Sequence, residues 1–186
     1  SIGFDLSQGQ LYWLIAMPGL AGGTLRLVWT FLPPIMGTRK LVTLTTALFL
    51  IPLIGWALAV QNPETPYAVL MLLGILAGIG GGAFSGFMPS TSYFFPRSKQ
   101  GTALGVQAGI GNFGVSIVQF VTPWIIGIAI IGGSQMMTNK DTGATKEVWY
   151  QNAGYVWVPF VVVAVILAWV LLRSVPVQAR GFRDQL

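Results

Sequence analysis

Two stretches of this sequence hold residues that could do chemistry. The stretch GIGNFG, residues 109–114, has the spacing G-x-G-x-x-G, which in soluble enzymes cradles the phosphates of a dinucleotide. Arg26 is the single charged residue of the long apolar stretch PGLAGGTLRLVWTFLPP. A charge in such a setting is expected to face a partner of opposite charge or polar backbone groups. Whether either stretch binds a ligand depends on the elements that position it.

The composition indicates a protein whose surface mostly faces something other than water. Of the 186 residues, 54% are hydrophobic and 8% are charged, whereas soluble domains carry roughly 25% charged residues. Five apolar segments each approach the roughly 20 residues that a helix needs to cross a bilayer. All are too long and continuous for barrel strands, which alternate over about 10 residues. We therefore predict an all-α membrane protein with spans at about 10–34, 41–60, 67–95, 101–131 and 148–172.

The residue types that are missing exclude several kinds of site. The chain has no cysteine and no histidine, so disulfides, thiolate metal sites, cysteine nucleophiles and histidine bases are excluded. None of the five spans contains Asp or Glu. A membrane-embedded enzyme is therefore disfavoured, because acid–base and metal chemistry would lack their usual groups. We expect no metal, no cofactor and no enzymatic activity.

The basic residues indicate how the chain is oriented in the membrane. The net charge of +5 comes from residues between the apolar runs rather than on one face, which favours membrane orientation over nucleic-acid binding. Two loop residues, Lys140 and Lys146, lie on one side. Seven others follow the first, third and fifth spans, and this set is expected in the cytoplasm: Arg39, Lys40, Arg97, Lys99, Arg173, Arg180 and Arg183.

This orientation places the start of the chain outside the cytoplasm. An uncleaved protein that starts outside and has five spans is unusual, and one further helix before Ser1 would restore an inside start. We therefore expect residues 1–186 to be an internal fragment that lacks the first helix and forms most of one half of a larger transporter.

Arg26 lies too deep to reach water with ease. At about 1.5 Å of rise per residue, Arg26 is about 12 Å from the end of its span at Pro34. This is too far for its side chain to extend easily to the membrane–water interface. A charge near the middle of a membrane costs at least about 2.5 kcal/mol, so Arg26 should have a partner. An anionic substrate is the simplest partner; backbone carbonyls, or a carboxylate elsewhere in the protein, are the alternatives. Its helix face is otherwise small and polar, which suits a close neighbouring helix: Gly19, Gly22, Thr30 and Pro33.

The surroundings of GIGNFG predict a membrane helix rather than a dinucleotide site. An apolar face that includes Ile110 and Phe113 lies opposite a stripe of small and polar residues. This pattern requires one continuous helix. No strand precedes the motif and no acidic residue follows about 20 positions later, so a dinucleotide site is excluded. The stripe consists of Thr102, Gly105, Gly109, Asn112, Ser116 and Gln119.

Two side chains at a similar depth are candidates to face a ligand. Asn112 lies about 16 Å from the cytoplasmic end of its helix, where its amide either donates to an anion or joins two helices. Phe84 lies about 15 Å from the inner end of the third span at Phe94 and either packs or forms a wall for a flat ligand. The third span also has small residues on one face: Gly74, Gly78, Gly81 and Ser85.

At these residues the chain resembles the nitrate/nitrite porter family (the NarK and NarU type) of the major facilitator superfamily. The stretch GTALGVQAGIGNFGVSIVQF is similar to the nitrate signature of that family, and GGAFSGFMPSTSYFFP and LRLVWTFLPPIMGTRK support the match. The resemblance covers essentially all 186 residues and implies the second to sixth helices of a twelve-helix fold. The loop PPIMGTRK keeps the glycine and basic pair of the wider superfamily but lacks its usual aspartate.

The resemblance also implies roles for individual residues. Arg26 matches the anion-binding arginine of the second helix, Phe84 the aromatic beside the anion, and Asn112 the signature asparagine. Beside these residues, we expect Gly105, Gly109 and Gly111 to let a neighbouring helix pack closely near the site. A second arginine and further aromatics would come from the missing C-terminal half.

The function implied by the resemblance is alternating-access transport of nitrate and nitrite across the inner membrane of a bacterium, in nitrate assimilation. Exchange of nitrate for nitrite is the first expectation, because these spans hold no carboxylate or histidine that could carry protons. Proton-coupled nitrate symport, transport of another small anion and an anion channel remain as alternatives. The expected partners are nitrate and nitrite, the lipid bilayer and the missing half of the protein, but no nucleic acid.

Overall fold

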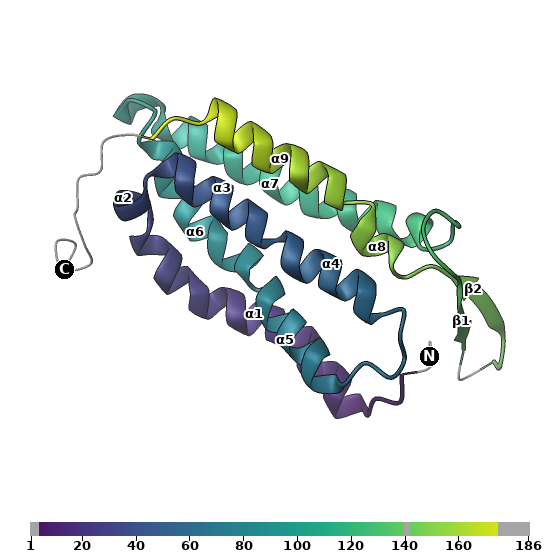
Figure 1. Ribbon diagram of the computed structural model, residues 1–186. Helices are drawn as coiled ribbons and strands as arrows, with labels where there is room; N and C mark the ends of the chain where they lie inside the picture. Colours follow the sequence, from purple (N-terminus) through teal and green to yellow (C-terminus); the bar gives the residue numbers. More distant parts are fainter. Residues whose placement is uncertain (1–3, 140–141, 175–186) are drawn as a thin grey trace.

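The computed structural model describes residues 4–139 and 142–174, and it is a bundle of long helices (Figure 1). Lys140, Arg180 and Arg183, which enter the orientation argument, lie outside the described residues. The elements run in chain order α1 (Gln8–Phe31), α2 (Pro33–Met36), α3 (Thr38–Leu48), α4 (Leu50–Ala59), α5 (Tyr67–Ala77), α6 (Ile79–Ser92), α7 (Arg97–Ile125), β1 (Gln135–Thr138), β2 (Thr145–Val148), α8 (Asn152–Tyr155) and α9 (Val158–Leu171).

Within the described residues, five helical stretches are long and apolar enough to cross a membrane. They are α1, α3 with α4, α5 with α6, α7, and α8 with α9. The prediction of a helical membrane protein with five spans is thereby confirmed. The chain is a multi-pass membrane protein.

Local sequence signals explain how the first helices begin and end. The hydroxyl of Ser7 accepts from the backbone N–H of Gln10 at 3.3 Å, and the Gln10 side chain accepts from the Ser7 backbone at 2.9 Å. This reciprocal pair satisfies two N–H groups at the start of α1. After α2, Gly37 has φ of 75°, a backbone conformation that favours glycine, and α3 starts at the next residue.

The helices pack in three rows. Figure 1 shows α1 and α5 along one side, α3, α4 and α6 in the middle, and α7 and α9 on the other side. The contacts agree with this view, since α1 packs on α6 and α5, and α3 packs on α9 and α6. The most deeply buried apolar residues come from α3, α4, α5 and α6: Leu41, Ala57, Leu70 and Ala83. In α7, by contrast, Ile125 alone is buried.

The segment after α7 is held by two side chains that are completely buried, Gln151 and Asn152. The Asn152 amide donates to the carbonyls of Ile125 and Ile128, at 3.3 and 2.8 Å. The Gln151 amide donates to two further carbonyls, those of Ile131 and Gly133, each at 2.8 Å. These bonds take up carbonyl groups where the helix ends. Helix α7 accordingly ends at Ile125, and the residues up to 131 are not helical.

The loop between the fourth and fifth spans contains a β-hairpin that the sequence analysis does not predict. β1 and β2 pair antiparallel, with Gln135 opposite Val148 and Thr138 opposite Thr145. Beside the hairpin, the Gln135 side chain donates to the Gln151 oxygen at 2.8 Å. The hairpin is therefore tied to the buried amides that close α7.

Candidate functional site

The side chain of Arg26 joins two helices. On α1, its Nε donates to the carbonyl oxygen of Gly81 on α6 at 3.2 Å. A backbone carbonyl was one of the three partners that the sequence left open, and the structure contains that bond. Among the described residues, the rest of the guanidinium makes no hydrogen bond or ion pair, and Arg26 is exposed. The two terminal nitrogens of the planar guanidinium (called the fork below) are therefore free to bind an anion.

The backbone of Arg26 is held by two hydroxyl groups. Thr30 donates to the Arg26 carbonyl at 2.7 Å from the next turn of α1. Ser85 on α6 donates to the same carbonyl at 3.0 Å and lies 2.9 Å from the carbonyl of Gly82. The main chain and the side chain of Arg26 are thus both tied to α6.

Glycine makes the close approach of α1 and α6 possible. A Cβ added at Gly22 would lie 3.1 Å from the Gly78 oxygen and 3.2 Å from the Gly81 Cα. A Cβ at Gly78 would lie 2.6 Å from the Cβ of Ala21. The expectation that small residues on these two faces admit a close neighbour is confirmed at this contact. Gly19 is not part of it, because a Cβ there would meet nothing within 4 Å.

Phe84 lies on the same helix as the carbonyl that holds Arg26. It follows Gly81 by about one turn of α6 and precedes Ser85 by one residue. Its side chain is 40% exposed, so packing within this chain does not fully bury it. Its role as a wall for a flat ligand stays a prediction.

Asn112 lies on α7, apart from this pair. Its side chain is exposed, and no hydrogen bond of the described residues joins it to Arg26, to Phe84 or to any other residue. Near the Arg97 end, the Gln100 amide ties the start of α7 to the end of α6, donating to the Ser92 carbonyl at 3.0 Å. The structure thus brings Arg26 to the helix of Phe84, and it leaves Asn112 without a partner in the part of the chain it describes.

The packing role of the α7 glycines also stays a prediction. A Cβ added at Gly105, Gly109 or Gly111 would meet nothing within 4 Å of the described chain. The glycine contacts that this chain makes are instead those between α1 and α6. The face of α7 that carries the small and polar stripe is open to a neighbour outside the described residues.

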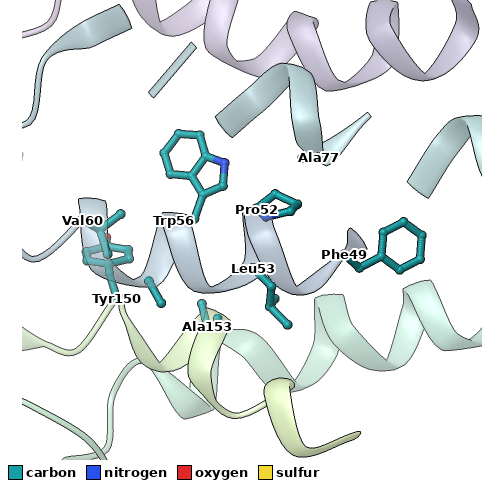
Figure 2. Close-up of a pocket in the computed structure, with 10 residues that line it drawn as sticks. Phe49, Pro52, Leu53, Trp56, Val60, Ala77, Tyr150 and Ala153 are labelled. Carbon is teal, nitrogen blue, oxygen red and sulfur yellow. The ribbon is translucent and has the colours of Figure 1, made fainter. Parts of the chain in front are cut away.

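The hollow shown in Figure 2 is separate from Arg26. It has a volume of about 410 Å³ and lies between α4, α5 and α8. Figure 2 shows Trp56 and Pro52 on the Ala77 side of α4, and Leu53 on the Ala153 side. The lining is almost entirely apolar and includes none of the three candidate ligand-binding residues. It therefore suits packing against lipid or protein rather than binding of an anion.

The described residues contain no group of three or more His, Cys, Asp or Glu side chains that could hold a metal ion. The polar groups that gather around Arg26 are donors and backbone carbonyls. Sequence reasoning missed the two that come from α6, the Gly81 carbonyl and the Ser85 hydroxyl. The glycine-rich face that ends in Ser85 was the available signal, since it predicted a close neighbour without identifying Arg26 as the contact.

Comparison of the sequence with known proteins shows which family the chain matches. The family model described as Major Facilitator Superfamily matches residues 2–185. The chain is 67% identical over 188 residues to a "Probable nitrate/nitrite antiporter NarK2" of Thermus thermophilus, covering 99% of this chain and 42% of that protein. It is 36% identical over 187 residues to the "Nitrate/nitrite transporter NarU" of Escherichia coli (strain K12), covering 100% of this chain and 40% of that protein.

A more distant relative aligns over part of the chain. The "Probable nitrate transporter NarT" of Staphylococcus aureus (strain Newman) is 32% identical over 124 residues, covering 67% of this chain and 30% of that protein. The chain therefore spans less than half the length of the curated relatives it matches.

Proposed function

The chain belongs to the major facilitator superfamily, and from this premise we propose that it forms part of a secondary transporter that carries nitrate and nitrite by alternating access. The observation that carries the proposal is the free fork of Arg26, which is held by one backbone carbonyl and has no carboxylate partner among the described residues. The names of the relatives, which refer to nitrate and nitrite, support the choice of substrate.

The chemistry of nitrate matches that fork. Nitrate is flat, singly charged and rich in hydrogen-bond acceptors, and a guanidinium presents N–H donors in one plane with the spacing of two oxygens. With Nε bound to Gly81, the terminal N–H groups of Arg26 remain for the anion. We assign the binding of the anion to Arg26, with Phe84 against its face and Asn112 as a second donor.

Alternating access requires a second body against which this bundle moves. We propose that a C-terminal half supplies it, together with further anion-binding residues, and that the site lies between the halves near the midplane. The open glycine face of α7 and the exposed side chain of Asn112 support this arrangement. The proposed location is the inner membrane of a bacterium, with the Arg39, Arg97 and Arg173 loops in the cytoplasm.

Exchange of nitrate for nitrite is the favoured mode, and it serves nitrate assimilation. The five spans contain no Asp, Glu or His, the usual proton carriers. The relative from Thermus thermophilus is named an antiporter, which also supports exchange. The same lack of acid–base groups supports a transporter rather than an enzyme.

The test uses the full-length protein in vesicles loaded with nitrite. Uptake of labelled external nitrate should be several-fold faster than in unloaded vesicles and should saturate. Equal rates in loaded and unloaded vesicles would overturn exchange. Uptake driven by a pH gradient alone would favour proton symport, and uptake that does not saturate would favour a channel.

A further inference from the structure

We propose that the glycine contact between α1 and α6 aims the guanidinium of Arg26 at the anion, with Gly22, Gly81 and Ser85 as positioning residues. This inference rests on the proposed function and extends it from the residue that binds the anion to the backbone that orients it. None of the three residues needs to touch nitrate. Each acts through Arg26.

The bond at Nε determines where the rest of the guanidinium points. The Nε–H lies in the plane of the guanidinium, so a fixed acceptor there sets the orientation of that plane. The outer edge, with one N–H from each terminal nitrogen, then points away from that acceptor. The acceptor here is the backbone oxygen of Gly81, 3.2 Å from Nε. Because a backbone carbonyl inside a helix cannot rotate freely, it orients the fork more firmly than a mobile side chain would.

The backbone contacts prevent Arg26 from sliding along α6. Ser85 donates to the Arg26 carbonyl at 3.0 Å, one turn of α6 beyond the residue that accepts from the side chain. The two bonds run in opposite directions between the helices, one from α1 to α6 and one from α6 to α1. Together they fix both the position and the rotation of Arg26 relative to Phe84.

The fit of the two helices sets the length of the Nε bond. An N–H···O bond weakens beyond about 3.2 Å, so the 3.2 Å bond between Arg26 and Gly81 has little room to lengthen. A Cβ at Gly81 would lie 3.2 Å from the Gly22 Cα, and one at Gly22 would lie 3.1 Å from the Gly78 oxygen. Either methyl group would push α1 and α6 apart by a few tenths of an ångström, while leaving every donor and acceptor in place.

The chain offers matched controls for this substitution. At Gly19 and Gly23, on the same helix as Gly22, an added Cβ meets nothing within 4 Å. Alanine there changes helix propensity in the same way but leaves the contact with α6 intact. Gly78 and Gly82 are unsuitable test positions, because an added Cβ would lie 2.6 and 2.7 Å from neighbouring side-chain atoms and would endanger folding.

The experiment measures nitrate counterflow by the full-length protein in nitrite-loaded vesicles. We expect Gly22→Ala and Gly81→Ala to raise the KM for nitrate by about 5- to 10-fold through misplacement of the fork. Maximal velocity should change by less than about twofold, since the groups that bind are retained. Gly19→Ala and Gly23→Ala should keep the wild-type KM. Ser85→Ala adds no volume and should raise the KM by about threefold, by loss of one hydrogen bond.

A double-substitution cycle separates positioning from simple support of the fold. Lysine at position 26 has no planar fork to aim, so Gly81→Ala should change the KM of the Arg26→Lys protein by less than about twofold. Effects that multiply in the double variant would overturn the proposal and assign Gly81 a general packing role. A wild-type KM in both Gly22→Ala and Gly81→Ala would also overturn it. Absence of nitrate counterflow in the wild-type protein would instead overturn the proposed function.

Discussion

The guanidinium carbon of Arg39 lies 4.2 Å from the centroid of the Trp169 ring, and this contact joins the start of α3 to the end of α9. Arg39 therefore also holds two helices together, besides the orienting role that the sequence predicts for it. Trp169 is 50% exposed, and a cation over an exposed indole face contributes about 0.5–1 kcal/mol. The contact ties the second of the five spans to the last, near the end of the bundle that carries the basic loops.

The Arg39–Trp169 contact predicts a measurable loss of stability. Trp169→Leu should lower the free energy of unfolding by about 0.5–1 kcal/mol beyond the effect of lost apolar area. The measurement is thermal denaturation of the purified protein in detergent. Trp124→Leu is the control, because Trp124 is also exposed and makes no ring or cation contact among the described residues. Equal shifts in the two variants would assign the contact no energetic role.

Replacement of Arg26 by lysine should separate charge from shape. Arg26→Lys keeps the positive charge but loses the planar donors, so the KM for nitrate should rise by at least about tenfold, equivalent to about 1.4 kcal/mol. Arg97→Lys, at the start of α7, is the matched control and should leave the KM unchanged. An unchanged KM in Arg26→Lys would show that Arg26 is not a ligand of the anion.

Asn152 should be essential for the end of α7. Its side chain is fully buried and donates to the carbonyls of Ile125 and Ile128. Asn152→Leu is close in volume but leaves the buried carbonyl of Ile125 and the carbonyl of Ile128 without this donor, which should destabilise the protein by about 1–3 kcal/mol. Unfolding by heat in detergent measures this loss. Gln119→Leu, at an exposed position of α7 without a hydrogen bond among the described residues, should be neutral.

The five spans could be predicted because their apolar runs persist over a length that a helix in lipid requires. The end of the fourth span could not be predicted, because Asn152 takes the Ile125 carbonyl from 27 positions further along the chain. The local run of apolar residues favours a longer helix there. The helix ends earlier because the side-chain amide of Asn152 binds the carbonyls of Ile125 and Ile128. The apolar run therefore continues to 131, although the helix does not.

At the candidate site, too, one part could be predicted from the sequence and another could not. Arg26 could be singled out because a lone charge in an apolar run is costly and rare. Its bond to the carbonyl of Gly81, 55 positions away, could not be read from the sequence, since every residue has a carbonyl. The glycines of the third span predicted a close neighbour, and the fold then decided which helix approaches and which carbonyl faces Arg26.

Phe84 should contribute to nitrate binding through its ring. Phe84→Ala should raise the KM for nitrate by about 3- to 10-fold, the range of an aromatic contact worth about 0.5–1.5 kcal/mol. Counterflow into nitrite-loaded vesicles measures the change. Phe120→Ala is the control, because Phe120 is 72% exposed on the apolar face of α7 and is not expected to reach the anion. If both variants kept the wild-type KM, Phe84 would be a packing residue.

Asn112 should tolerate the loss of its amide better than the gain of a charge. Asn112→Ala removes one donor and should raise the KM for nitrate by about 3- to 10-fold. Asn112→Asp places a like charge beside the anion, and at about 4 Å this repulsion reaches several kcal/mol, so transport should be abolished. Gln119→Glu adds the same charge to the same stripe, about 10 Å further along α7, where the repulsion is much weaker. A normal KM in Asn112→Asp, with folding verified by gel filtration, would place Asn112 outside the site.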